Sequence, residues 1–322
     1  MSTDPVVILH SSRVAEVKPP VAAAHPDLAI HLCDSYEALP DLLAETRAEV
    51  VYTVRFAGTP RFPRQALLES PTVKWISVGG SGTDHLRPWD PARTAVTNAA
   101  GVASDAMAEY ALGAMLAFAL DHRGFRRAQQ EERWFAGEVG RIEGRTLLLV
   151  GLGRTGEAVA RRAKAMDMTV LGVRANPAPV AHVDEVHPVS ALPALWPRAD
   201  FVVVAVPLLP ATRGLVGREA FAALPPHAVL IDVSRGGVVE EAALLAALDE
   251  GRLKGAALDV FASEPLPPGH PLWRMENVMI TPHCSSVFAG WEAKSAGMFA
   301  ANLARWRRGE PLANLVDPAR GY

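Results

Sequence analysis

An arginine, a glutamate and a histidine in the second half of the chain are the residues best suited to chemistry. Arg235, Glu264 and His283 each follow shortly after an apolar run of the kind that forms a buried strand. An imidazole beside a carboxylate can donate and accept a proton near neutral pH. A guanidinium can hold a carboxylate through paired hydrogen bonds. Singly, each residue has an ordinary explanation in a loop or on the surface; together they predict an acid–base pair with an anchor for an organic acid.

Three glycines follow the apolar segment Thr146–Val150 at regular spacing: Gly151, Gly153 and Gly156. In a strand–turn–helix unit, the first permits the tight turn, the second lets the backbone approach a pyrophosphate, and the third lets the helix pack on the strand. The helix expected at Glu157–Met166 directs its unpaired N–H groups toward the phosphates. The segment therefore predicts a dinucleotide site.

The end of the next strand, Arg174, bears on which dinucleotide is bound. An NAD site places an acidic residue roughly twenty residues after the glycines, where it bonds the ribose 2′-hydroxyl. This chain has Arg174 there, while Asp167 comes too early and Asp184 too late. Because a guanidinium can pair with the 2′-phosphate of NADP, the sequence favours NADP, and NAD stays possible.

The elements that must position these residues alternate between strand-like and helix-like segments. Before residue 121, the sequence predicts strands at Val6–Leu9, Leu28–Leu32, Val50–Val54, Val73–Val78 and Ala95–Asn98, and helices at Ser35–Thr46, Pro63–Leu68 and Gly101–Leu120. After Thr146–Val150, it predicts strands at 169–174, Phe201–Val206, Val229–Val233, Ala256–Phe261 and Val278–Thr281, and a last helix at Trp291–Arg307. Such alternation predicts parallel sheets, in which ligands bind beyond the carboxyl ends of the strands. Arg235, Glu264 and His283 are expected to converge there.

The fold class expected is α/β with two parallel-sheet domains. A chain of 322 residues suits two domains of common size. Because the alternation restarts at Thr146, we expect a Rossmann coenzyme domain (99–284) inserted into a flavodoxin-like substrate domain (1–98 and 285–322).

The composition is that of a globular protein, with 49% hydrophobic and 21% charged residues. A net charge of -3 argues against a nucleic-acid-binding surface. Cys33 and Cys284 form neither a disulfide framework nor a metal-binding cluster, which favours a reducing cytoplasm. The start of the chain lacks a signal-peptide pattern, and the apolar stretch Tyr110–Leu120 is too short to span a bilayer. We therefore expect a cytoplasmic protein without a membrane partner.

Motifs along most of the chain resemble the D-isomer-specific 2-hydroxyacid dehydrogenase family, and within it most closely the NADPH-dependent glyoxylate/hydroxypyruvate reductases. The motifs are Gly79–His85, Val96–Ala99, Gly151–Gly156, Val206–Leu208, Ser234–Gly237, Leu258–Leu266, Thr281–His283 and Val316–Tyr322. The resemblance implies hydride transfer between NADP(H) and a small 2-oxo or 2-hydroxy acid.

The resemblance also implies roles for individual residues. His283 would protonate the carbonyl oxygen in reduction, and Glu264 would orient and stabilise the charged imidazole. Arg235 would bind the carboxylate and carbonyl of the substrate. The backbone N–H groups of Ser81 and Gly82 would hold the carboxylate from the other domain, so that domain closure would exclude water.

Cofactor contacts follow from the same resemblance. Asp259 would meet the nicotinamide amide. Further cofactor contacts would come from Arg154 and Thr155 at the pyrophosphate and from the backbone near Val206, Pro207 and Val233. No metal site is expected. A homodimer built through the coenzyme domain is expected from the apolar face of Gly101–Leu120 together with the resemblance.

The chain departs from the commonest family pattern at two places. Asp232 stands where Asn is frequent, and Cys284–Ser286 follow His283 where apolar or small residues are usual. Both bear on substrate fit more than on reaction class. Arg55, Phe56 and Trp134 are further candidates for the substrate pocket, each equally explained by packing or surface exposure.

Two alternatives have the same fold. A formate dehydrogenase lacks the glutamate partner of the histidine, so Glu264 argues against it. A cofactor-sensing corepressor-like binding protein retains a similar arginine, glutamate and histidine, so these three residues do not by themselves establish turnover.

Overall fold

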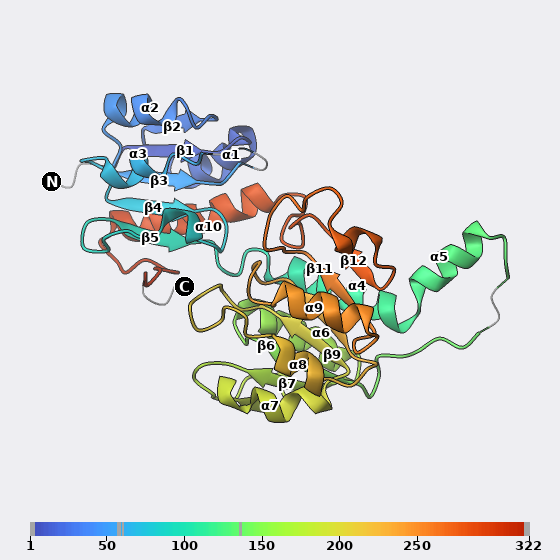
Figure 1. Ribbon diagram of the computed structural model, residues 1–322. Coiled ribbons are helices and arrows are strands. Elements are labelled where there is room, and N and C mark those ends of the chain that lie inside the picture. Colours follow the sequence, from blue (N-terminus) through green and yellow to red (C-terminus); the bar gives the residue numbers. More distant parts are fainter. Residues whose placement is uncertain (1–3, 57–58, 60, 135–136, 319–322) are drawn as a thin grey trace. The chain divides into compact units, whose positions relative to one another are not determined.

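The computed structural model describes residues 4–318 except 57–58, 60 and 135–136. The end of the closing motif, residues 319–322, lies outside the described chain. Two compact units make up the protein (Figure 1): unit 1 takes in the described residues up to Val102 and from Phe288 onward, and unit 2 is Ala103–Val287. Among the described residues, no helix has both the length and the apolar character needed to cross a membrane.

Unit 1 is built on a five-stranded sheet of parallel strands in the order β2-β1-β3-β4-β5. This is the flavodoxin-like order, as the sequence predicted. The strands are β1 (Val7–His10), β2 (Ile30–Cys33), β3 (Val50–Thr53), β4 (Trp75–Val78) and β5 (Ala95–Asn98).

Helices cover both faces of the unit 1 sheet, because successive strand residues point to opposite faces. Val7 and Leu9 pack with residues of α1 and α10, whereas Ile8 and Val51 pack with residues of α2 and α3. The helices are α1 (Val14–Ala24), α2 (Leu39–Thr46), α3 (Arg64–Glu69) and α10 (Trp291–Arg307).

The sequence analysis missed α1, which contains Pro19 and Pro20. A proline inside a helix removes a backbone hydrogen bond and clashes with the preceding turn, which argues against a helix there. Tertiary packing overrides this cost: Val17 and Val21 are fully buried in the cluster that includes α10.

Unit 2 is built on a seven-stranded parallel sheet in the order β12-β11-β10-β9-β6-β7-β8. In chain order this is the Rossmann arrangement extended by one strand, and the order reverses between β6 and β9. The predicted fold class is thereby confirmed. The strands are β6 (Thr146–Val150), β7 (Thr169–Val173), β8 (Glu185–His187), β9 (Phe201–Val204), β10 (Val229–Asp232), β11 (Gly255–Leu258) and β12 (Val278–Ile280).

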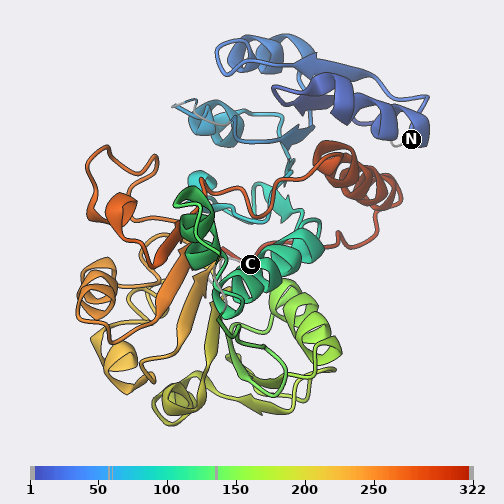
Figure 2. The same ribbon diagram turned by 90° about the vertical axis from the view of Figure 1, so that its right-hand side faces the viewer.

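Helices also cover both faces of the unit 2 sheet. On one face α4 and α6 lie side by side (Figure 2), and α7, α8 and α9 pack on the other. Figure 1 shows α5 directed away from the sheet of this unit. The helices are α4 (Ser104–Ala119), α5 (His122–Gln130), α6 (Arg154–Ala165), α7 (Leu192–Leu195), α8 (Arg218–Ala223) and α9 (Glu241–Asp249).

Five strands of unit 2 end earlier than the sequence predicted: β7 at Val173, β9 at Val204, β10 at Asp232, β11 at Leu258 and β12 at Ile280. The apolar residues continue past the end of β11, because Val260 and Phe261 are buried in a loop. Apolar character reports burial and does not show where the backbone leaves the sheet. The loops that begin at these strand ends carry the candidate site.

Candidate active site

Arg235, Glu264 and His283 follow three neighbouring strands of unit 2. Strand β10 pairs with β11, and β11 pairs with β12, in both cases parallel. The carboxyl ends of parallel neighbours share one edge of the sheet, so the loops that follow them are adjacent. The structure therefore places the three predicted residues on adjacent loops.

His283 and Glu264 form a hydrogen-bonded pair. The His283 Nδ1 atom lies 2.8 Å from Glu264 Oε2, and the other glutamate oxygen accepts a hydrogen bond of 3.0 Å from the Phe261 N–H. The side chains keep 37% and 36% of their surface exposed, so the pair is open to a small molecule. Because Nδ1 faces the carboxylate and donates to it, Nε2 is the nitrogen available for proton exchange with a substrate.

The pKa of Glu264 reflects several opposing influences. Burial by itself would raise this pKa. Hydrogen bonds from His283 and Phe261, together with the positive charges of His283 and Arg235, more than offset burial and hold the pKa of Glu264 below its usual range. Glu264 is therefore an anion at neutral pH, as a partner for a protonated imidazole must be.

A glycine next to Arg235 lets the loop that carries Arg235 lie close to the loop that carries Glu264. The Arg235 Nη1 atom donates a 2.8 Å hydrogen bond to the Ser234 carbonyl oxygen. A Cβ atom on Gly236 would lie 1.8 Å from the Phe261 carbonyl oxygen, so only glycine allows the loop after β10 to approach the loop after β11 this closely. This close approach brings the charge of Arg235 within reach of Glu264.

A buried carboxylate, Asp259, organises the turn that carries His283. Its Oδ1 atom accepts hydrogen bonds from Thr281 Oγ1 (2.7 Å) and Cys284 N–H (2.8 Å), and its Oδ2 atom accepts one from Ser285 N–H (3.0 Å). Sequence reasoning named Asp259 only as a nicotinamide contact. Asp259 also accepts hydrogen bonds from residues before and after His283. These bonds join the ends of neighbouring strands, and no local sequence pattern reveals them.

The glycine turn after β6 fits a pyrophosphate. Gly151 has a φ of 112°, and a Cβ atom there would lie 2.6 Å from the Ala205 carbonyl oxygen. A Cβ on Gly156 would lie 2.1 Å from the Gly151 carbonyl oxygen, whereas one on Gly153 would meet nothing within 4 Å. Helix α6 begins at Arg154, followed by Thr155, and no side chain caps its N-terminus. The open backbone at Gly153 and these N–H groups suit an anionic group.

Arg174 follows β7, directly beside this turn, because β6 pairs with β7 and Gly151 N–H donates to the Val173 carbonyl. The nearest later carboxylate, Asp184, accepts a 2.7 Å hydrogen bond from Val170 N–H and pairs with Lys164 at 2.9 Å. Asp184 is thus bound to Val170 and Lys164. At the strand end, where an NAD site would have an acidic residue, this chain has the guanidinium of Arg174.

The other predicted cofactor contacts follow β9 and β10. Val206 and Pro207 come just after β9, and Val233 is buried just after β10. Thr212 donates to the Pro207 carbonyl oxygen at 2.6 Å and accepts from Leu209 N–H at 2.8 Å, which orders this loop.

In unit 1, Ser81 and Gly82 follow β4. The Asn98 side chain donates to the Ser81 carbonyl oxygen (2.8 Å), and Ala99 N–H donates to the Gly80 carbonyl oxygen (2.9 Å). These bonds orient the loop through its carbonyl groups. Within the described residues, the N–H groups of Ser81 and Gly82 donate no hydrogen bond, so the loop offers two donors to an anion.

The three further pocket candidates have different environments. Phe56 is buried and stacked on Tyr36 with ring centroids 4.3 Å apart, so its ring packs within unit 1. Arg55, two residues after the end of β3, is exposed. Trp134, in unit 2, is 93% exposed.

Comparison with known proteins identifies the family. Residues 112–285 match the model described as D-isomer specific 2-hydroxyacid dehydrogenase, NAD binding domain. The chain belongs to this family. The sequence-based resemblance and the expectation of an NAD(P)-dependent 2-hydroxyacid dehydrogenase are both confirmed.

Curated relatives of this dehydrogenase include two of different names. It is 38% identical over 231 residues to the glyoxylate reductase of Korarchaeum cryptofilum, covering 69% of each chain. It is 34% identical over 284 residues to the D-3-phosphoglycerate dehydrogenase of Methanocaldococcus jannaschii, covering 86% of this chain and 53% of that protein. The match thus spans about half of the latter enzyme.

Solved structures agree along almost the whole chain. A D-isomer specific 2-hydroxyacid dehydrogenase from Xanthobacter autotrophicus Py2, in complex with NADPH and MES, superposes with a TM-score of 0.86 at 32% identity, covering 99% of this chain and 100% of that one. The NADPH-dependent glyoxylate/hydroxypyruvate reductase of Sinorhizobium meliloti gives 0.83 at 27% identity, with the same coverage.

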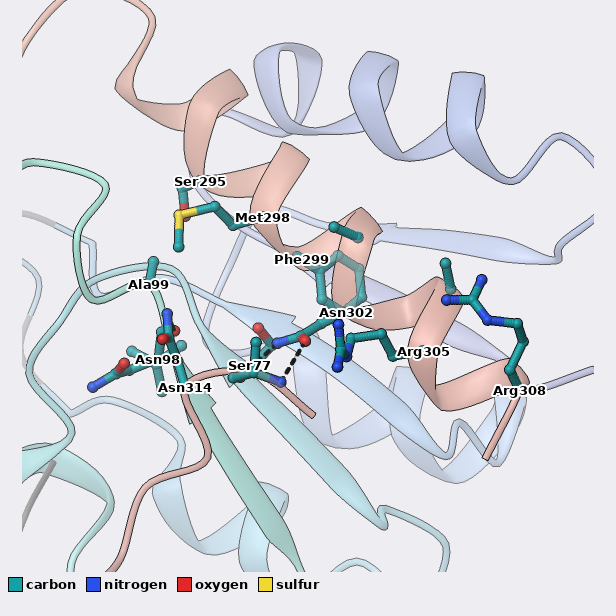
Figure 3. A pocket seen from close by; sticks show the side chains of 14 residues that line it. Ser77, Asn98, Ala99, Ser295, Met298, Phe299, Asn302, Arg305, Arg308 and Asn314 are labelled. Carbon is teal, nitrogen blue, oxygen red and sulfur yellow. Dashed lines mark hydrogen bonds between the residues drawn. The ribbon is translucent and has the colours of Figure 1, made fainter. Parts of the chain in front are cut away.

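Unit 1 of the dehydrogenase also contains a cavity of about 470 Å³ (Figure 3). Its walls are α10, β4, β5 and the segment after α10. Asn302 exchanges two 2.8 Å hydrogen bonds with the backbone of Ala313, and Arg308 pairs with Glu310. Neither His283 nor Glu264 lines this cavity.

Proposed function

We propose that this dehydrogenase reduces a small 2-oxo acid, such as glyoxylate or hydroxypyruvate, to the 2-hydroxy acid with NADPH. The observation that carries the proposal is the hydrogen-bonded pair of His283 and Glu264, on loops adjacent to the loop that carries Arg235. The names of the Korarchaeum and Sinorhizobium relatives support these substrates.

The proposed chemistry divides among the three side chains. Arg235 binds the substrate carboxylate through its guanidinium and polarises the adjacent carbonyl. His283 transfers its Nε2 proton to the carbonyl oxygen, and Glu264 stabilises the imidazolium before that transfer. NADPH, when bound, supplies the hydride that reaches the carbonyl carbon. One 2-oxo acid, one proton and one NADPH thus give one 2-hydroxy acid and one NADP⁺, and the reverse reaction uses neutral His283 as the base.

The remaining contacts are assigned by the same reasoning. Unit 2 binds the coenzyme, as the predicted domain 99–284, and unit 1 contributes to substrate binding. Ser81 and Gly82 bind the substrate carboxylate through their N–H groups. The coenzyme contacts are Gly151, Gly153, Arg154, Thr155 and Gly156 at the pyrophosphate, Arg174 at the 2′-phosphate, Val206, Pro207 and Val233 along the cofactor, and Asp259 at the nicotinamide amide.

A panel of 2-oxo acids, assayed by oxidation of NADPH and of NADH, tests the proposal. We expect turnover of glyoxylate or hydroxypyruvate with a higher kcat/KM for NADPH than for NADH. Arg174→Asp should erode this ratio mainly by weakening NADPH, because it replaces an attraction for the 2′-phosphate by a repulsion. Equal efficiency with both cofactors in the parent would refute the cofactor assignment.

The same panel separates the alternatives. Tight NADPH binding without oxidation by any 2-oxo acid would favour the cofactor-sensing, corepressor-like protein. Oxidation of formate with NADP⁺ or NAD⁺ would favour a formate dehydrogenase. We further propose that the protein is cytoplasmic, because Cys33 and Cys284 are free thiols and a reducing compartment keeps thiols free. We also propose that it is a homodimer built through the coenzyme domain.

A further inference from the structure

A chain of hydrogen bonds runs from helix α4 to the turn that carries His283. The Tyr110 hydroxyl lies 2.8 Å from Thr281 Oγ1, which donates to Asp259 Oδ1 at 2.7 Å. A threonine hydroxyl has one hydrogen, and here the carboxylate takes it. Tyr110 must therefore donate to Thr281, so the chain runs in one direction, from Tyr110 through Thr281 to Asp259.

The turn that receives this chain is strained. His283 has a φ of 52°, in the left-handed region that is unfavourable for a residue with a side chain. Such a conformation persists only where its surroundings over-determine it. Thr281 lies just before His283, and Cys284 and Ser285 lie just after it; Asp259 binds all three.

The surroundings keep Tyr110 a donor. Burial, which has the largest effect, and the negative charges of nearby acidic groups together raise the pKa of Tyr110 to about 12, although the hydrogen bond with Thr281 lowers it. The hydroxyl is therefore protonated at any pH at which the enzyme would work. Its single hydrogen is committed to Thr281, so Tyr110 acts through Thr281 and not on substrate.

We propose that Tyr110 is a positioning residue for the reaction: by polarising and orienting Thr281, it fixes the left-handed turn that directs the His283 imidazole. The inference rests on the proposed function, in which His283 transfers the proton. Without the tyrosine hydroxyl, Thr281 loses the partner that fixes its rotamer. The turn then loosens at its first anchor, and the contact of His283 with Glu264 is populated for less of the time.

The test is Tyr110→Phe, which removes one oxygen and keeps the ring. We expect kcat for 2-oxo acid reduction to fall by about threefold to tenfold, the size of one lost hydrogen bond. The KM for NADPH should stay within about twofold of the parent value, since the change lies in the turn and not at the pyrophosphate. The alkaline limb of the pH profile should move to lower pH, because a loosened Glu264 contact stabilises the protonated imidazole less.

Tyr52→Phe is the matched control. It removes another buried tyrosine hydroxyl that contacts a hydroxyl, that of Ser295 at 2.9 Å in unit 1. A comparable loss of thermal stability is expected, with the pH limb left at its parent position. A variant that only loses stability should keep both the acidic and the alkaline limb of its pH profile at the parent positions.

A second pair of variants keeps the test independent of how well Tyr110→Phe folds. Thr281→Val removes the relaying hydroxyl at nearly constant volume, and Thr281→Ser retains it. We expect Thr281→Val to lower kcat at least as much as Tyr110→Phe, Thr281→Ser to retain most of it, and the double variant Tyr110→Phe/Thr281→Val to match Thr281→Val alone.

Failure of this inference differs from failure of the proposed function. If His283→Ala abolishes turnover while Tyr110→Phe keeps the parent kcat and pH limb, the positioning role is wrong and the proposed mechanism stands. Additive effects in the double variant would also overturn it. If His283→Ala retains near-parent turnover, the proposed function is wrong, and this inference falls with it.

Discussion

At the scale of single residues, the site depends on how each charge is partnered. Glu264 is held anionic by His283, Phe261 N–H and Arg235, in spite of burial. Asp232 has the opposite balance: it is fully buried next to another carboxylate, and its pKa is raised. The pKa values of these two acidic residues are thus shifted in opposite directions by their local environments.

Replacing Glu264 with Gln tests the acid–base pair. The change removes the negative charge that stabilises protonated His283 and keeps the side-chain shape. Reduction needs the protonated imidazole, so the alkaline limb of kcat/KM for the 2-oxo acid should move to lower pH. Oxidation needs the neutral imidazole, so its acidic limb should also move down. His283→Ala should lower both directions by roughly a hundredfold to ten-thousandfold, with NADPH binding nearly intact. If neither limb of the pH profile moves in Glu264→Gln, the assignment of His283 and Glu264 as the acid–base pair is wrong.

Replacing Asp232 with Asn tests the buried carboxyl. Burial raises the pKa of Asp232 to about 7 from an ordinary value of 3.8; hydrogen bonds from Ser234 lower it, the charge of Asp259 raises it, and that of Arg235 lowers it. Because the folded pKa is the higher one, the stability that protonation provides is fully present below about pH 4 and is lost as pH rises toward 7. Asparagine stays neutral and its oxygen still accepts from Ser234.

The stability of Asp232→Asn relative to the parent should therefore increase with pH. Urea unfolding at pH 5 and pH 8 measures the difference in free energy of unfolding between the two proteins. We expect this difference to shift in favour of the variant by on the order of 1–3 kcal/mol between the two pH values. A difference that does not change with pH would show that Asp232 does not titrate in this range.

At the scale of elements, the site requires neighbouring strand ends to lie very close together. The loops after β10 and β11 meet at Gly236, where a Cβ atom would lie 1.8 Å from the Phe261 carbonyl oxygen. That oxygen belongs to the backbone and cannot rotate away. The closeness of these two loops is therefore what sets Arg235 beside Glu264, and a single methyl group is enough to separate them.

Gly236→Ala tests this packing. Separation of the loops should lower kcat/KM for the 2-oxo acid by tenfold or more and also reduce the unfolding midpoint, since the displaced backbone carries Arg235 with it. Gly297→Ala is the control: in α10 an added Cβ meets nothing within 4 Å, and alanine should stabilise that helix by about 0.5–1 kcal/mol. Parent-like activity in Gly236→Ala would refute the requirement.

At the scale of the whole molecule, unit 2 has large apolar side chains that the described residues leave exposed. Trp134 is 93% exposed and Val139 is 45% exposed, both in the segment after α5. In a monomer, a tryptophan side chain this exposed does not gain the free energy that burial of its apolar ring would provide. Tryptophan is also enriched at the centres of protein interfaces. A second copy of the chain would cover these two side chains in the proposed homodimer.

Light scattering coupled to size exclusion tests the dimer. We expect twice the chain mass at micromolar concentration for the parent. Trp134→Asp should shift the mass toward that of one chain, because it places a charge in the expected interface. Trp273, 53% exposed elsewhere in unit 2, serves as the control position, and Trp273→Ala should leave the mass unchanged. A monomeric parent would refute the proposal.

The sequence by itself determined the class of fold, because buried parallel strands read as short apolar runs and the glycine spacing after Val150 reports a local turn. It also placed Arg235, Glu264 and His283 at strand ends, since their positions depend only on which residues follow each run. Asp259 as the anchor of the His283 turn, Tyr110 as its distant support and α1 in spite of Pro19 and Pro20 were decided by tertiary structure. In each case the cause is a contact between segments far apart in the chain, and such contacts leave no periodic or local trace in the amino-acid order.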